Sequence, residues 1–166
     1  MELDVLCEDP RWAGVDLEAL TQRAADAALA YLGMDGQLAM FSVLGCDDAR
    51  ISVLNGEFRG KPSPTNVLSW PSEDLAAAQD GGAPQAPVLD YSGYFDLGDI
   101  AISFDTCTRE AEAAGKPFAD HVCHLIVHGL LHLLGYDHIR DLDATLMEHN
   151  ETVILGKLGL DDPYRS

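Results

Sequence analysis

The amino-acid sequence predicts a single α+β domain, in which a small mixed β-sheet is packed with helices and a metal site lies on one helix and the turn that follows it. Three observations support this fold class. The length of 166 residues suits one compact domain. Hydrophobic residues make up 47% and charged residues 23% of the chain, as is usual for globular proteins. The predicted strands cluster early and the predicted helices late, rather than alternating regularly.

The first third of the chain predicts a helix and a strand. Asp16 is a good N-cap for a helix over residues 17–32, in which apolar side chains recur at helical spacing up to Gly33. Residues 38–44 form an apolar, β-compatible run bounded by glycines. We therefore expect the first strand there.

A short helix and a short strand are expected next. Asp47 offers a second N-cap, and apolar side chains on one face indicate a helix over residues 48–58. Residues 60–64 contain two prolines, which predicts irregular structure. A strand over residues 65–70 should then end at Pro71.

The second half of the chain begins with an expected insertion. Residues 72–93 are rich in Ala, Gly, Pro, Asp and Gln and show no sustained periodicity, which predicts a flexible surface insertion without catalytic residues. Alternating β-compatible residues predict a strand over residues 94–103. Helical patterns follow at residues 109–114, 119–134 and 142–158. All of residues 1–166 are thus expected to form one domain that carries the insertion.

The composition argues against several classes of protein. The N-terminus lacks the order of a secretory signal, and no apolar run approaches membrane-spanning length, so we expect a cytoplasmic protein with no membrane partner. Four scattered cysteines form no C-x-x-C pair and are expected to be reduced packing thiols. No glycine-rich phosphate loop is present, which argues against nucleotide-triphosphate chemistry.

The charge balance opposes non-specific binding of nucleic acid. Ten basic residues against 28 acidic ones give a formal charge of −18, which repels polyanions at long range. Any RNA substrate would therefore depend on positive charge concentrated at the site. The same acidity suits docking on basic proteins.

A cluster of histidines carries the clearest chemical signal. His128 and His132 are four residues apart, so a helix presents both imidazoles on one face. Gly135 can end that helix in the left-handed conformation, so that the chain doubles back and brings His138 to the same point. Three imidazoles suit zinc and leave a fourth position for water, as in catalytic zinc sites. This pattern predicts one zinc ion per chain, held by His128, His132 and His138.

Two alternatives apply to these histidines. They could be hydrogen-bonded core residues, or they could simply continue a stripe that includes His121 and His124. His124 and His128 are also four apart and form a competing pair. No glycine turn or third ligand follows that pair at a suitable distance, so we interpret His124 as a packing residue or as a support for a ligand.

The spacing of the three histidines is shared with the metzincin proteases, whose motif is H-E-x-x-H-x-x-G-x-x-H. Those enzymes place a glutamate after the first histidine as the general base, whereas this chain has Gly129. Peptide hydrolysis by that mechanism would therefore lack its base.

Several segments resemble the YbeY endoribonuclease family. Residues 128–138, HGLLHLLGYDH, are similar to the family signature H-G-x-L-H-L-x-G-Y-D-H. Residues 54–61 and 64–71 are similar to its motifs L-N-x-x-[YF]-R-x-K and P-T-[DN]-V-L-S-F-P, with Trp70 in place of phenylalanine. Further similarity covers residues 97–103, with the motif L-G-D-I-x-I-S, and the common chain end at 161–164.

This resemblance implies a metal-dependent endoribonuclease that is specific for single strands. It implies an α+β fold with a three-histidine metal site. It further implies a role in processing ribosomal RNA, notably the 3′ end of the small-subunit RNA, and in ribosome quality control. The expected partners are ribosomal RNA and the small ribosomal subunit with its proteins, and no DNA.

The resemblance also draws attention to individual side chains. Arg59 matches the family's arginine and could clamp the scissile phosphate with its planar guanidinium. Arg59 and His128 are therefore the predicted catalytic residues. Lys61 adds local charge or is merely solvated. Asp137 either orients a ligand imidazole or caps the returning loop, and Asp99 either faces the cleft or supports a bulge beside its glycine neighbour.

Two other functions remain open from the sequence. The metzincin spacing is compatible with a zinc metallopeptidase, although Gly129 argues against it. The net acidity is compatible with a non-catalytic ribosome assembly factor. For the endoribonuclease, a bound zinc ion can acidify water and polarise the phosphoryl group, and the RNA 2′-hydroxyl is an alternative nucleophile.

Overall fold

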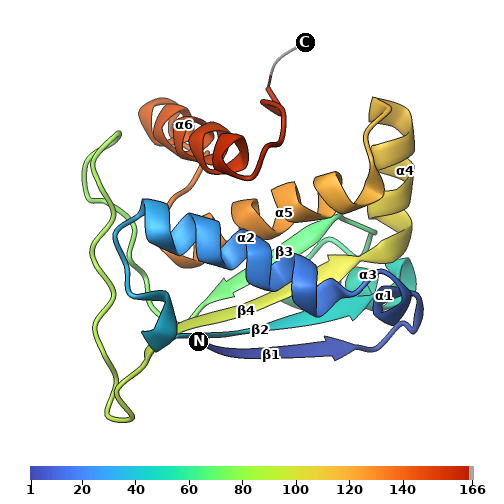
Figure 1. The fold of residues 1–166 in the computed structure, drawn as a ribbon, viewed down its shortest axis with the longest axis horizontal. Coiled ribbons are helices and arrows are strands. Elements are labelled where there is room, and N and C mark those ends of the chain that lie inside the picture. Colours follow the sequence, from blue (N-terminus) through green and yellow to red (C-terminus); the bar gives the residue numbers. More distant parts are fainter. Residues whose placement is uncertain (165–166) are drawn as a thin grey trace.

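The computed structural model describes residues 1–164 and contains one four-stranded sheet (Figure 1). The strand order is β1-β2-β4-β3. The first three of these run parallel, and β3 pairs antiparallel with β4 at the edge of the sheet. The predicted mixed sheet is therefore confirmed. The strands are β1 (Glu2–Cys7), β2 (Ala39–Cys46), β3 (Val67–Pro71) and β4 (Phe95–Ser103).

Helices cover the sheet mainly on one face. In Figure 1, α2 and α5 lie along that face and α6 lies farther out, over α5. No helix within residues 1–164 is long and apolar enough to cross a membrane. The helices are α1 (Arg11–Gly14), α2 (Leu17–Tyr31), α3 (Asp48–Arg59), α4 (Phe104–Ala114), α5 (Phe118–Leu133) and α6 (Asp141–Lys157), with a 3₁₀ turn at Gly36–Leu38.

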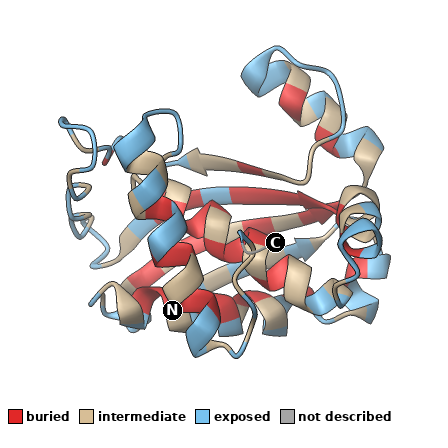
Figure 2. Cartoon of the chain, turned by 90° about the horizontal axis from the view of Figure 1, so that it is seen from above, coloured by how far each residue is buried: buried red, intermediate tan, exposed pale blue. Residues whose placement is uncertain are grey.

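Most residues of the central helix α5 are buried by the elements around it, and Figure 2 colours the whole chain by burial. From Val122 to Leu134, every residue is buried except three histidines, which lie one turn apart on the same side. The apolar residues of α5 belong to the main hydrophobic core together with those of α2, β2 and β4. Within this stretch of α5, the side chains available for chemistry are therefore His124, His128 and His132.

The short helix α1 and the 3₁₀ turn at Gly36–Leu38 were not predicted, and β1 and α4 also differ from the sequence-based expectation. β1 was not predicted, although Leu3, Val5 and Cys7 alternate with more exposed residues along it. As an edge strand of six residues it depends on its pairing with β2. α4 begins at Phe104, five residues before the expected start at residue 109. Its first residues include Thr106 and Thr108, which favour a helix only weakly, and packing of Phe104 on aromatic neighbours holds this end in place.

The cysteines are all free, as expected. Cys46, Cys107 and Cys123 are buried, and Cys7 is half-buried. Burial raises the pKa of the Cys46 thiol to about 12, with further contributions from nearby carboxylates. These thiols therefore act as small apolar packing groups.

The predicted insertion has neither helix nor strand between residues 72 and 94. It is nevertheless hydrogen-bonded to residues at the start of α6. Leu75 is 6% exposed, and the Arg140 guanidinium donates to the carbonyl of Ala77 at 2.8 Å. The Asp143 carboxylate accepts from the backbone N–H of Gly81 at 2.9 Å. The flexibility of the insertion stays a prediction. In the structure, Ala77 and Gly81 are hydrogen-bonded to the start of α6.

Asp99 lies on the face of the sheet opposite to α2 and α5. It does not line the cleft described below. Its carboxylate accepts a hydrogen bond from the Ser42 hydroxyl on the neighbouring strand. The register of β2 and β4 shifts beside Gly98, which has a φ of 121°. A Cβ atom at Gly98 would lie 2.1 Å from the Trp70 carbonyl oxygen. Of the two alternatives for Asp99, the structure supports the bulge.

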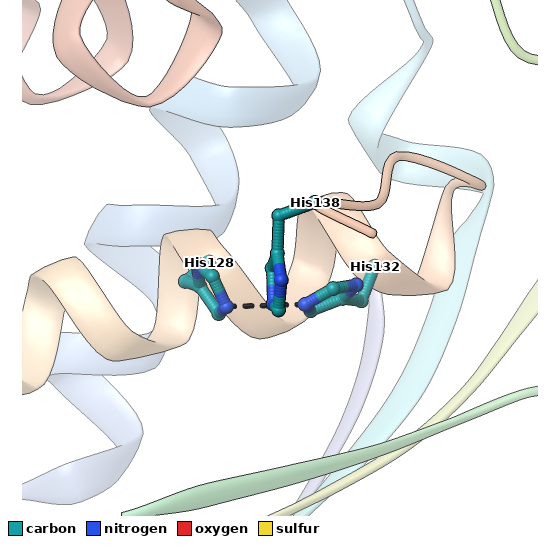
Figure 3. A group of neighbouring side chains, drawn as sticks. All are labelled: His128, His132 and His138. Carbon is teal, nitrogen blue, oxygen red and sulfur yellow. Dashed lines mark hydrogen bonds between the residues drawn. The ribbon is translucent and has the colours of Figure 1, made fainter. Parts of the chain in front are cut away.

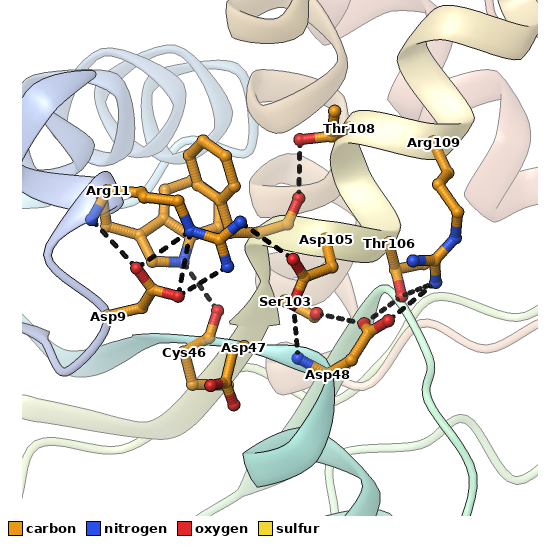
Figure 4. Close-up of polar contacts among 12 residues, drawn as sticks. Asp9, Arg11, Cys46, Asp47, Asp48, Ser103, Asp105, Thr106, Thr108 and Arg109 are labelled. Carbon is orange, nitrogen blue, oxygen red and sulfur yellow. Dashed lines mark hydrogen bonds and ion pairs between the residues drawn. The ribbon is translucent and has the colours of Figure 1, made fainter.

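A polar network joins α3 and α4 where β2 and β4 end (Figure 4). The Asp48 carboxylate accepts hydrogen bonds from the Ser103 and Thr106 hydroxyls, both at 2.6 Å. It also pairs with Arg109 at 2.8 Å. Burial alone would raise the pKa of Asp48, but these hydrogen bonds and the charge of Arg109 lower it. The network continues through Asp105, Arg11 and Asp9.

Replacing Asp48 by asparagine is expected to destabilise the fold by about 2 kcal/mol at pH 7, because hydrogen bonds to a charged group are lost. The folded-state pKa is lowered, so the stabilisation by this carboxylate is complete well above the unfolded pKa of about 3.9 and disappears as pH falls through the folded value. Denaturant unfolding of both proteins from pH 7 to pH 3 measures this. The difference should shrink with acid, whereas a pH-independent difference would contradict it. Glu112→Gln, an exposed site on α4, is the control.

Candidate metal centre and substrate cleft

The structure brings the three predicted histidines together. His128 and His132 extend from α5, and His138 reaches them from the following turn (Figure 3). Each offers one ring nitrogen, and these nitrogens all lie within 4.8 Å of one another. His128 and His132 are partly buried, whereas His138 is exposed. This candidate triad has its three donors on one helix and one turn, as the sequence predicted.

The hydrogen bonds of two rings determine which nitrogens are available. The Nδ1–H of His132 donates to the Tyr136 carbonyl at 3.0 Å, and the Nδ1–H of His128 donates to the Glu151 carboxylate. In the neutral rings, both Nε2 atoms are then unprotonated. These two atoms face each other at 3.1 Å. Two facing lone pairs repel each other unless a cation lies between them.

The separation of these two Nε2 atoms suits two ligands of a tetrahedral metal ion. Zinc–nitrogen bonds of about 2.0–2.1 Å at tetrahedral angles place two ligand nitrogens roughly 3.3–3.4 Å apart, close to the observed separation. Burial lowers the pKa of His132 to about 4, and the neighbouring His128 and His138 lower it further in the same direction. His132 is therefore neutral near pH 7, as a metal ligand must be.

Gly135 makes the turn that returns the chain to the triad. Its φ of 99° is in a region that L-residues rarely adopt. The backbone N–H of Tyr136 donates back to the Leu131 carbonyl at 3.0 Å and closes the helix end. A Cβ at Gly135 would also lie 2.6 Å from the Leu75 carbonyl oxygen. This glycine thus serves both the turn and the close approach of residues 72–94.

The triad lies in a cleft of about 550 Å³. Its walls come from the C-terminal end of α3, the edge strand β3, the turn after α5 and the beginning of the insertion. Arg59, the last residue of α3, lines this cleft. Lys61 is not among the residues that line it. Arg59 is exposed and forms no ion pair within residues 1–164. The predicted catalytic arginine and the triad therefore share one cavity.

The charge of the cleft walls is mixed. Among the lining residues within 1–164, Arg59 is the one lysine or arginine, and Glu73, Asp74 and Asp137 oppose it. Arg59 is therefore the positively charged side chain that an anionic substrate would meet in the described part of this cleft. Two of the three acidic residues belong to the insertion, which was expected to be a flexible surface segment without catalytic residues.

Comparison with known proteins identifies the family. The sequence profile described as "Endoribonuclease YbeY" matches residues 7–159. The chain belongs to the YbeY endoribonuclease family. Proteins named endoribonuclease YbeY are similar over nearly the whole chain in Ruegeria pomeroyi (68% identity, 99% of this chain and 98% of the relative) and in Paracoccus denitrificans (57% identity, 98% and 89%). YbeY endoribonucleases are hydrolases of phosphodiester bonds.

A solved structure supports the fold. The solution structure of TM1509 from Thermotoga maritima matches with a TM-score of 0.54 and 20% identity, covering 99% of both chains. At this identity the likeness concerns the fold alone.

Gly129 occupies the position that separates YbeY proteins from the metzincins. It is buried where α5 crosses the sheet. A Cβ there would lie 3.2 Å from the Ile100 side chain and 3.2 Å from the Ser69 hydroxyl. A side chain at this position would press on Ile100 and Ser69, so the glutamate of a metzincin would require these side chains of β3 and β4 to shift.

Asp137 stabilises the turn of this YbeY protein rather than a ring. Its carboxylate accepts from the backbone N–H of His138 at 2.7 Å. Within residues 1–164, none of the three imidazoles of the triad donates to it. The loop-capping alternative therefore describes the geometry.

Glu151 is the residue of this site that the sequence did not reveal. It comes from α6, is fully buried and contacts both His124 and His128. These three residues form a second group with metal-binding potential. The sequence showed no third partner for the His124–His128 pair, because Glu151 follows His128 by 23 positions. A signal was present: Glu151 shares a helix face with the buried Met147, Ile154 and Leu155.

Proposed function

We propose that this chain is a zinc-dependent endoribonuclease, specific for single strands, that processes ribosomal RNA, notably the 3′ end of the small-subunit RNA, and acts in ribosome quality control. The observation that carries the proposal is that the Nε2 atoms of His128 and His132 face each other at 3.1 Å in the cleft that Arg59 lines, while the Nδ1 atom of each ring is hydrogen-bonded elsewhere. The ribosomal role is supported by the resemblance of residues 54–71 and 128–138 to the motifs of the family.

The candidate ligands are His128, His132 and His138, which would hold one zinc ion per chain. Zinc in such a site acidifies a water molecule and polarises a phosphoryl oxygen. The protein's own contribution is to keep the imidazoles neutral and oriented, through the hydrogen bonds to Tyr136 and Glu151. We therefore assign His128 a role as ligand as well as its predicted catalytic role.

Arg59 would bind the scissile phosphate. Its guanidinium is free to form two parallel hydrogen bonds with phosphate oxygens and to stabilise the charge that develops during cleavage. The acidic residues around it disfavour a polyanion that lacks this specific contact. We infer that the acidity of the chain as a whole serves docking on basic proteins of the small ribosomal subunit. We place the reaction in the cytoplasm, where ribosomal RNA is found, and propose RNA rather than DNA as the substrate.

Removal of the metal tests this proposal. Protein treated with a chelator and then dialysed should lose cleavage of single-stranded ribosomal RNA, and one equivalent of zinc per chain should restore it, because three histidines provide one site. The measurement combines elemental analysis with gel analysis of a labelled RNA that contains the 3′ end of the small-subunit RNA. The same sequence annealed into a duplex should be resistant.

Two results would contradict the proposal. Activity that persists in metal-free protein would exclude a role for zinc. Zinc-loaded protein that cuts no RNA but co-sediments with small subunits would favour the assembly-factor alternative. A peptide library digested in parallel tests the metallopeptidase alternative, which the close contacts beside Gly129 oppose.

A further inference from the structure

Glu151 is a buried carboxylate in contact with one of the candidate ligands. Its side chain is fully buried, yet it accepts hydrogen bonds from three different groups. The Nδ1–H of His128 donates to one oxygen, and the Nε2–H of His124, at 3.2 Å, and the Tyr164 hydroxyl donate to the other. A buried charge is stable only when it is paired or hydrogen-bonded in this way.

The hydrogen bond to Glu151 determines which nitrogen of His128 is available. A carboxylate oxygen of Glu151 accepts from Nδ1 of this ring, which favours the neutral tautomer that carries its proton on Nδ1. The other nitrogen, Nε2, faces His132 at 3.1 Å.

The same contacts argue against a second metal ion between His124, His128 and Glu151. For an ion to bind there, His128 would have to lose the proton from Nδ1 while its Nε2 also serves the triad. The carboxylate oxygens are already occupied by three donors from α5 and the C-terminal segment. The geometry is that of a hydrogen-bonded support.

We propose that Glu151 is a positioning residue, which fixes the tautomer and the ring orientation of His128 so that Nε2 faces the metal position. His124 and Tyr164 hold the carboxylate in place from its other side. This inference rests on the proposed zinc site and extends it to α6 and the C-terminal segment. Carboxylates that accept from a ligand histidine typically change metal affinity 10–100-fold when they are replaced.

Replacement of Glu151 by glutamine tests the proposal. Glu151→Gln keeps the shape of the side chain and removes its charge, so the Kd for zinc should rise about 10–100-fold. Zinc binding is measured by competition with a chromophoric chelator. The absorption spectrum of the cobalt(II)-substituted protein should change as well, because a reoriented His128 alters the ligand field, and a merely structural loss would leave that spectrum intact in the folded fraction.

The chain offers a matched control. Glu110 accepts from His121 at 2.9 Å, so this pair repeats the carboxylate–histidine contact on the same side of α5, outside the triad. Glu110→Gln should leave the zinc Kd and the cobalt spectrum unchanged. Tyr164→Phe removes one donor to Glu151 and should weaken zinc binding by only a few-fold.

A measurement on the unaltered protein keeps the proposal testable if Glu151→Gln does not fold. Long-range ¹H–¹⁵N spectra of histidine-labelled protein report the tautomer of each ring, and His128 should carry its proton on Nδ1 both with and without zinc. A proton on Nε2 in the metal-free protein would overturn the proposal, as would an unchanged zinc Kd in folded Glu151→Gln. Two zinc ions per chain, with the second lost in that variant, would also overturn it. If the unaltered protein binds no zinc, the proposed function fails instead.

Discussion

Replacing His132 by alanine is expected to eliminate stoichiometric zinc binding and to reduce RNA cleavage by roughly a thousandfold or more, the equivalent of about 4 kcal/mol of activation free energy. His132 is the middle residue of the triad, and its Nε2 lies 3.1 Å from that of His128. Its pKa is lowered to about 4, so protons do not compete with a metal ion for this ring near neutral pH. Elemental analysis and single-turnover cleavage of labelled RNA measure the two effects.

The control for this variant is another histidine of the same helix. His121→Ala removes an imidazole that donates to Glu110 and does not line the cleft, so zinc content and cleavage should remain at the level of the unaltered protein. Thermal unfolding of the metal-free proteins must show that His132→Ala is folded. A folded His132→Ala protein that retains zinc and cleaves RNA would show that the triad is not the metal site.

The pattern of the sequence was sufficient for those parts of the fold that local rules determine. The helices that begin after Asp16 and Asp47 were predicted because aspartate is a favoured N-cap residue. In the structure each of these side chains accepts from a backbone N–H in the first turn. β1 could not be recognised with the same rules, since an edge strand acquires its conformation from its partner. The early start of α4 likewise depends on contacts of Phe104 with Trp12 and Phe118.

In the candidate site, too, local sequence rules predicted some residues and missed those that tertiary contacts bring in. His128, His132 and His138 lie within eleven residues, and helical geometry plus one glycine turn relates them without any long-range information. Glu151 reaches the site only through the packing of α6 on α5, and a sequence pattern does not specify which faces of two helices meet. The approach of the insertion to Gly135 is also a tertiary contact, so its acidic residues were not expected in the cleft walls.

Replacing Arg59 by alanine should lower kcat/KM for RNA cleavage by about 100- to 1000-fold while the protein keeps its zinc. Losses of this size are typical when a donor that stabilises transition-state charge is removed. The effect is expected to be large here because, within residues 1–164, Arg59 is the one lysine or arginine in the lining of a cleft that also contains Glu73, Asp74 and Asp137. Zinc content and steady-state kinetics on single-stranded RNA, measured on the same preparation, separate this effect from loss of the metal.

The chemical form of the arginine, and not only its charge, should decide the outcome. Arg59→Lys retains the charge but cannot make two parallel hydrogen bonds to a phosphate, so its kcat/KM should fall between those of the unaltered protein and Arg59→Ala. Lys61→Ala removes a nearby charge that does not line the cleft and should change the rate little. Equal losses in Arg59→Ala and Lys61→Ala would mean that the basic residues after α3 act through general attraction of RNA. The selective loss in Arg59→Ala is expected because its side chain lies in the same cavity as the histidine triad.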